Sequence, residues 1–120
     1  ELTVVTWGAM VERCEQAAAA SAVDVELLDL RTLVPWDRAA VLASVAATHR
    51  CLIVHEDNMT AGFGAEIAAV LAQQAFADLD APMERLAMPD IPVPHSPWLL
   101  DALLPAPDAI VAAIRRLASY

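Results

Sequence analysis

The chain has 120 residues, the size of one compact domain, and we expect a single domain over residues 1–120. Its seven basic residues, all of them arginine, stand against 16 acidic residues, and the formal net charge of −9 argues against nucleic acids and anionic membranes as partners. Hydrophobic residues make up 58% of the chain, yet no uninterrupted apolar stretch approaches the roughly 18 residues that span a bilayer.

The two cysteines, Cys14 and Cys51, are too few and too far apart for a disulfide framework or a zinc site, so we expect both to be small core residues. The chain opens with a strand-like pattern rather than with the basic and apolar regions of an export signal, and we expect a cytoplasmic location. The high apolar fraction has two explanations that stay open. Either alanine is simply abundant, as in the run Ala17–Ala20, or another chain or domain covers part of the surface.

The first half of the chain alternates patterns of period two and period 3.6. They predict, in order, a buried strand over Leu2–Thr6, a helix from Ala9 to about Ala20, a strand over Val23–Leu30 and a helix from about Asp37 through Val45. The start of the second helix is the best defined, because Pro35 disfavours an earlier start and the Asp37 carboxylate can accept a hydrogen bond from an early N–H group.

The second half continues in the same way. It predicts a strand over Cys51–His55, a helix with the apolar face Phe63, Ile67, Val70 and Leu71, a weaker strand over Met83–Met88, and a last helix that begins at Pro107. Between the last two elements, four prolines from Pro89 to Pro97 exclude a central strand and predict a rigid, extended surface segment. Strands that alternate with helices of this length predict an α/β domain with a mostly parallel sheet covered on both faces.

The loop after Cys51–His55 is the richest in groups that could bind or react, because function gathers beyond the carboxyl ends of parallel strands. His55 and Glu56 resemble an acid–base pair, but neighbours on a strand point to opposite faces, which argues against it. Gly62 and Gly64 precede a helix whose free N–H groups could hold an anion. The simpler interpretation is that these glycines allow a tight turn, since the pattern matches neither a dinucleotide fingerprint nor a P-loop.

Other catalytic constellations are missing from the sequence. No Gly-x-Ser-x-Gly occurs, and three scattered histidines lack the paired spacing of zinc ligands. We therefore predict no catalytic, cofactor-binding or metal site in this chain. Trp7 and Trp36 are expected to plug the end of the sheet, whereas Trp98 fits a plug and a partner surface equally well.

Several segments together resemble a known family. They are Thr6-Trp7-Gly8-Ala9-Met10-Val11, Asp29-Leu30-Arg31-Thr32-Leu33-Val34-Pro35-Trp36-Asp37, His55-Glu56 with Gly62-Phe63-Gly64-Ala65-Glu66-Ile67-Ala68-Ala69, and Leu79-Asp80-Ala81-Pro82. In this order and spacing they resemble the carboxyl-terminal domain of the transketolase family, and within it the beta subunit of thiamine-diphosphate-dependent 2-oxo acid dehydrogenases of the pyruvate and branched-chain type.

The resemblance implies a three-layer α/β/α fold with a five-stranded mixed sheet, one strand of which is antiparallel. It also implies that an amino-terminal pyrimidine-binding domain is missing here. In the family, that missing domain and an alpha subunit hold thiamine diphosphate, magnesium and the catalytic groups. The present domain would pair with a second beta subunit and bind the subunit-binding domain of the dihydrolipoyl acyltransferase, a basic partner that suits an acidic chain. Its partner-facing region would be Pro89–Trp98 together with the last helix.

Carried over residue by residue, the resemblance gives structural rather than catalytic roles. Arg31 would pair with a carboxylate and Asp37 would cap a helix. The structural or interface candidates are Arg31, Asp37, Glu56, Gly62, Gly64, Glu66, His95 and Trp98. The chain departs from the family at Asp57–Ala61, where Ala-Pro-Arg-Thr-Gly is usual, at Leu100, where a glutamate is common, and at Pro94-His95, where Pro-Tyr is frequent and Pro-His is more typical of branched-chain enzymes.

Two other functions remain open. The chain would also suit the carboxyl-terminal domain of another thiamine enzyme such as 1-deoxyxylulose-5-phosphate synthase, although the string from Gly62 to Ala69 argues against it. A free-standing α/β module that binds a small anion at the loop Glu56–Gly64 is the alternative of a different class. The sequence does not identify the 2-oxo acid.

Overall fold

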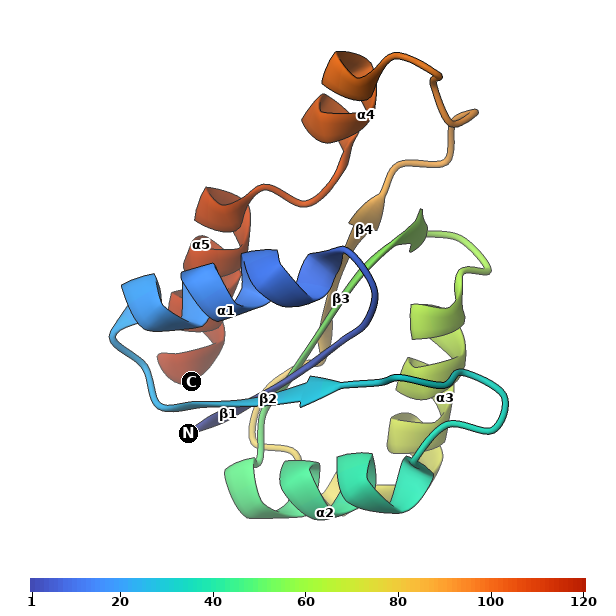
Figure 1. Cartoon of the computed structure of the whole chain (residues 1–120). Coiled ribbons are helices and arrows are strands. Elements are labelled where there is room, and N and C mark those ends of the chain that lie inside the picture. The colour runs from blue at the N-terminus through green and yellow to red at the C-terminus, as the bar shows by residue number, and fades with distance from the viewer.

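The computed structural model describes residues 1–120, in which strands and helices alternate as far as the fourth strand and two helices follow (Figure 1). The elements are β1 (Leu2–Thr6), α1 (Met10–Ser21), β2 (Val25–Asp29), α2 (Arg38–Thr48), β3 (Cys51–Asn58), α3 (Phe63–Gln74), a short 3₁₀ helix (Phe76–Asp78), β4 (Glu84–Met88), α4 (Pro97–Leu103) and α5 (Pro107–Ala118).

The sheet has four strands in the order β2-β1-β3-β4, and every neighbouring pair is parallel. The predicted α/β class and mostly parallel sheet are confirmed, but the expected fifth, antiparallel strand is wrong. The chain after β4 carries Pro89, Pro92 and Pro94, which lack the N–H groups that a ladder requires. This segment therefore leaves the sheet and continues into α4.

Strand position explains the two sequence patterns. The central strand β1 is buried along its whole length, as is β3 from Cys51 to His55, and both read as continuous apolar runs. Strand β2 lies at the edge and is only partly buried, and its sequence alternates. Strand β3 continues to Asn58, beyond the predicted end at His55. Its pairing with β4 is interrupted after Val54 by a shift in register and resumes where Asn58 pairs with Met88.

The sheet separates two hydrophobic cores. Helices α1 and α5 pack together on one face, and helices α2 and α3 cover the other (Figure 1). Ile110, Ile114 and Leu117 of α5 are fully buried in the first core, and Ile67 and Leu71 of α3 are fully buried in the second. Each such side chain contributes about 1.5–3 kcal/mol on leaving water, so the layers hold together through the stripes that the sequence predicts.

Local signals place the helix ends. The Asp37 carboxylate accepts a hydrogen bond from the Ala40 N–H at 3.0 Å and caps α2 as expected. His49 ends the same helix in the left-handed region with φ 64°. Helix α4 was not predicted: it begins at Pro97, the end of the expected extended segment, and no element was assigned between there and Pro107.

The stretch Pro97–Ala118 is the one helical region long and apolar enough to cross a membrane by length and composition. It is not a continuous helix, because α4 ends at Leu103 and α5 begins at Pro107. The two parts have separate contacts: α5 packs on α1, whereas α4 is held by the Arg13 guanidinium, which binds the Asp101 carboxylate and donates to the Pro105 carbonyl at 3.2 Å.

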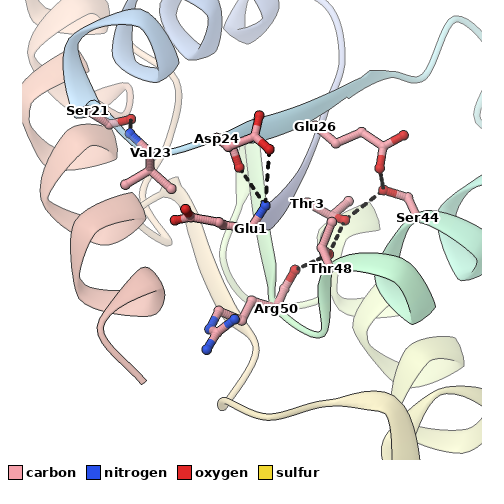
Figure 2. Close-up of polar contacts among 9 residues, drawn as sticks. All are labelled: Glu1, Thr3, Ser21, Val23, Asp24, Glu26, Ser44, Thr48 and Arg50. Carbon is pink, nitrogen blue, oxygen red and sulfur yellow. Dashed lines mark hydrogen bonds and ion pairs between the residues drawn. The ribbon is translucent and has the colours of Figure 1, made fainter.

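A chain of hydroxyl groups ties α2 to the sheet at the amino ends of the strands (Figure 2). The Ser44 hydroxyl donates to the Glu26 carboxylate at 2.7 Å, so it accepts from Thr3, whose oxygen lies 2.7 Å away. Thr48 lies 2.7 Å from the same Thr3 oxygen, and because the Thr3 proton is used on Ser44, the single Thr48 proton is shared between the Thr3 oxygen and the Arg50 carbonyl at 3.2 Å. Thr3 is fully buried, and this chain of hydrogen bonds allows its hydroxyl to lie inside the core.

Candidate interface and binding surfaces

Four aromatic rings close the carboxyl end of the sheet on the side of α2 and α3. Trp7 stacks on His55 with ring centroids 5.1 Å apart and an angle of 8° between the planes. Phe63 makes T-shaped contacts with Trp7 and Trp36, with ring centroids 5.9 and 6.5 Å apart. Trp7 is 8% exposed and Trp36 is partly buried, so both plug the end of the sheet as predicted.

His55 is the central residue of this row. Its ring is fully buried, and neither ring nitrogen has a hydrogen-bond partner. Burial lowers the pKa of His55 below its ordinary value of 6.5; the Asp57 carboxylate opposes this shift and the Arg85 guanidinium adds to it. The imidazole is therefore neutral at pH 7 and packs as an aromatic ring. Glu56, the next residue, is exposed on the opposite side of the strand, so the two do not form an acid–base pair.

The glycines before and within α3 allow a close approach to this ring. A Cβ on Gly64 would lie 2.4 Å from His55 Nε2, and a Cβ on Gly62 would lie 2.1 Å from the Asn58 carbonyl oxygen. These contacts confirm the interpretation of a tight turn. Glu66 lies in the first turn of α3, where its negative charge opposes the binding of an anion at the helix end.

The loop that departs from the family pattern is anchored to the proline segment. The Thr60 N–H donates to Asp90 Oδ1 at 2.9 Å, and its hydroxyl donates to Asp90 Oδ2 at 2.5 Å. These hydrogen bonds hold the pKa of the Asp90 carboxyl below its ordinary value. Ala61 follows with φ 60°, a left-handed conformation that favours glycine, and it stands where the family pattern has glycine.

The remaining interface candidates lie on the surface and are not brought together. Arg31 donates to the Asp29 carboxylate at 2.6 Å, which is the carboxylate partner expected for it. His95 is exposed in the proline segment, and Trp98 is 87% exposed in the first turn of α4. Their interface roles remain predictions.

Two open grooves with apolar linings lie at the two ends of α3. The first, which we name the loop groove, has a volume of about 520 Å³ and is lined by Leu33, Val34, Pro35, Trp36, Arg38, Phe63 and Glu66. The second, the C-terminal groove, has a volume of about 750 Å³ and is lined by Ala72, Phe76, Ala77, Leu79, Asp80, Ala81, Pro82, Met83 and Tyr120.

The sequence reasoning did not single out Phe76 or Tyr120, which are 77% and 62% exposed. A signal for Phe76 exists. The buried face of α3 runs through Ile67, Val70 and Leu71 and continues to the buried Ala75, so an aromatic residue one position later is out of phase with the core. Tyr120 carries no such signal, because its place beside the groove depends on contacts distant in sequence.

Four parallel strands with two helices on each face define a doubly wound α/β domain. Residues 1–110 match the family model described as transketolase, C-terminal domain, and the chain belongs to that family. A solved structure described as a split gene transketolase, inactive beta4 tetramer, superimposes with a TM-score of 0.80 and 22% identity over 99% of this chain and 38% of that one. This likeness confirms the fold.

The chain is also similar to curated beta subunits. It is 42% identical over 117 residues to the 2-oxoisovalerate dehydrogenase subunit beta of Pseudomonas aeruginosa, covering 97% of this chain and 33% of that protein. It is 41% identical to the acetoin:2,6-dichlorophenolindophenol oxidoreductase subunit beta of Cupriavidus necator, covering 97% and 35%. It is 34% identical to the pyruvate dehydrogenase E1 component subunit beta of Rickettsia conorii, covering 99% and 37%. The chain thus spans about a third of the length of these relatives.

Proposed function

We propose that this chain is the non-catalytic pairing and assembly domain of the beta subunit of a thiamine-diphosphate-dependent 2-oxo acid dehydrogenase. The observation that carries the proposal is the match of nearly the whole chain to beta subunits at 34–42% identity. The site geometry agrees with a role without catalysis, because His55 and the glycines around it are used in packing. Two buried free cysteines suit the cytoplasmic location that we also propose.

Thiamine diphosphate and magnesium belong, in this proposal, to the complete enzyme and are held outside this chain. A diphosphate needs cations or free N–H groups. At the start of α3 the backbone lies against the His55 ring and Glu66 stands in the first turn, while the loop groove is lined by one arginine and one glutamate. These residues do not fit the cofactor, so no chemical step is assigned to them.

The C-terminal groove is the surface that we propose for the basic subunit-binding domain of the acyltransferase. It is apolar at its centre, where Phe76 stands exposed, and acidic at its rim, where Asp78 and Asp80 are exposed. An apolar centre with a charged rim is the usual anatomy of a protein interface, and the rim complements a basic partner. The apolar stripe of α5 packs against α1 and is not available, so the last helix takes part only through the adjoining Tyr120. The proline segment and Trp98 remain the second candidate surface.

The test is calorimetric titration of the chain with that subunit-binding domain at low and high salt. We expect binding that weakens with salt, because opposite charges are screened. Phe76→Ala should weaken binding by at least about tenfold, as for an exposed aromatic anchor. Trp98→Ala is the matched control, since it removes an equally exposed aromatic side chain elsewhere.

A loss confined to Trp98→Ala would move the surface to the proline segment. No binding at any salt concentration would contradict the assembly role, and the mass of the chain under native conditions would then show whether pairing alone remains. A second candidate for the whole enzyme is an acetoin-type oxidoreductase, which the 41% identity to the Cupriavidus necator subunit favours. Activity of the complete enzyme on acetoin and on branched 2-oxo acids would separate the two.

A further inference from the structure

The loop groove has the size and the apolar lining of a small-molecule site. Its volume of about 520 Å³ lies within the range of about 300–1,000 Å³ that such sites occupy. Trp36 and Phe63 line it with two partly buried rings at right angles to one another. Val34 also lines it and is 89% exposed, so an apolar group bound in the groove would cover surface that now lies in water.

Arg38 presents free hydrogen-bond donors to this groove. Five of the seven arginines donate to a carboxylate or a backbone carbonyl, whereas the exposed guanidinium of Arg38 has no such partner. Its Cζ lies over the Trp36 ring, 5.7 Å from the centroid. This cation–π contact positions the guanidinium through its face and leaves the N–H groups at its edge free. A guanidinium held in this way can bind a carboxylate through two parallel hydrogen bonds.

Two carboxylates stand at the same groove. Glu66 lines it, is exposed, and takes part in no ion pair. Asp37 is exposed directly before Arg38, and because its Oδ1 accepts from the Ala40 N–H, its second oxygen is free. The groove and its edge therefore carry one positive and two negative charges. A simple anion is disfavoured there, whereas a ligand with both a carboxylate and an ammonium group complements both signs.

We propose that the loop groove binds a free α-amino acid with a large apolar side chain. The ligand's carboxylate binds the edge of the Arg38 guanidinium, and its ammonium group donates to Glu66. Its apolar side chain packs on Trp36 and Phe63. An amine leaves Arg38 without a partner and a 2-oxo acid leaves Glu66 without one, so the groove distinguishes an amino acid from both. This site is separate from the C-terminal groove and does not depend on the assembly role proposed above.

The test is calorimetric titration of the chain with L-leucine, which carries all three features of the ligand. We expect a dissociation constant below about 1 mM, which is within reach of a ligand of this size. Isopentylamine has the same apolar group and the ammonium but no carboxylate, and the 2-oxo acid of leucine has the carboxylate but no ammonium. Each should bind at least about tenfold more weakly than leucine, because each lacks one charge-assisted contact.

Variants that remove one charge assign the two ends of the ligand. Arg38→Gln should bind leucine about tenfold more weakly and should no longer prefer it to isopentylamine. Glu66→Gln should weaken leucine binding by a similar factor and lose the preference for leucine over its 2-oxo acid. Glu15→Gln is the matched control, since it removes an exposed carboxylate from α1 on the other side of the sheet, and it should bind leucine within about twofold of the natural chain.

Backbone amide chemical shifts during the titration give the place of binding and show that each variant is folded. The shifts that leucine causes should be confined to residues 33–38 and 63–66. Neither heat nor shifts at about 10 mM leucine would overturn the proposal. Equal affinity for leucine, isopentylamine and the 2-oxo acid would also overturn it, because apolar contact alone would then explain the binding. Shifts centred on the C-terminal groove would overturn the placement at Arg38 and Glu66.

Discussion

Replacing Gly64 by alanine tests the packing of His55 against α3. Alanine is the better helix former by about 1 kcal/mol, so an unobstructed helix would gain stability from the change. In this structure the new Cβ would lie 2.4 Å from His55 Nε2, 2.5 Å from His55 Cδ2 and 3.2 Å from Ile53 Cγ2. The ring is fully buried and stacked on Trp7, so it cannot move aside without disturbing the aromatic row.

The magnitude follows from two opposing effects. Overpacking a dense core costs about 1–3 kcal/mol, and a contact more than half an ångström inside the normal limit belongs at the upper end. Subtracting the helix gain of about 1 kcal/mol leaves a destabilisation of about 2 kcal/mol. For a domain of this size, that lowers the melting temperature by roughly 8 °C.

Urea unfolding followed by circular dichroism would measure the effect in two backgrounds. His55→Ala itself costs about 2–4 kcal/mol through the cavity it leaves. In that background Gly64→Ala has room, and we expect it to stabilise the chain by about 1 kcal/mol, which gives a coupling of about 3 kcal/mol between the two positions. Gly62→Ala is the control, because the clash of its Cβ with the Asn58 carbonyl oxygen at 2.1 Å remains when His55, whose Cε1 lies farther away at 3.0 Å, is removed, so this variant should stay destabilised in both backgrounds. A Gly64→Ala variant as stable as the natural chain, or equally destabilised in both backgrounds, would refute the packing described here.

Four further predictions follow from the same contacts. His55 has a lowered pKa in the folded chain, so the unfolded chain binds more protons below pH 6.5 and stability should fall as the pH drops through that value. The urea midpoint should therefore be lower at about pH 5.5 than at about pH 7.5, and this difference should be smaller in His55→Ala. Thr3→Val removes the middle of the hydroxyl chain in Figure 2 and should cost about 1–2 kcal/mol in urea unfolding, whereas an unchanged midpoint would mean that the chain adds nothing. Ala61→Gly relieves the left-handed residue at φ 60° and should stabilise by about 0.5–1 kcal/mol, and any loss of stability would contradict that conformation. Burial raises the pKa of Cys51 to about 12 and that of Cys14 to about 11, so an aromatic disulfide reagent should label neither thiol until the chain unfolds; rapid labelling of the native chain would show that they are accessible.

Most of the fold follows from local sequence patterns, because each pattern reports a local physical requirement. The alternation over Val23–Leu30 marks an edge strand that is only partly buried, and the continuous run from Cys51 to His55 marks a strand buried on both sides. Asp37 identifies a helix start because a carboxylate there satisfies a free N–H group. These features depend on a few neighbouring residues, and the structure agrees with them.

The features that the sequence did not predict depend on contacts between distant segments. The fifth strand was expected from family resemblance, whereas the prolines after β4 already argue against it. Helix α4 depends on Arg13, which lies about 90 positions away and binds both Asp101 and the Pro105 carbonyl. The glycines were correctly expected to allow a tight turn, but their partner, the buried ring of His55, becomes visible only when β3 and α3 are assembled.

The two explanations for the high apolar content apply to different parts of the molecule. Alanine accounts for much of it on the outer faces of α1, α2 and α3, where small side chains add little exposed apolar area. The large exposed apolar residues are few, and they are gathered at the loop groove, at the C-terminal groove, and along the proline segment with α4. Random exposure would spread them over the surface. Their grouping, with exposed acidic residues at the rim of the C-terminal groove, agrees with the docking surface that we propose there for a basic partner.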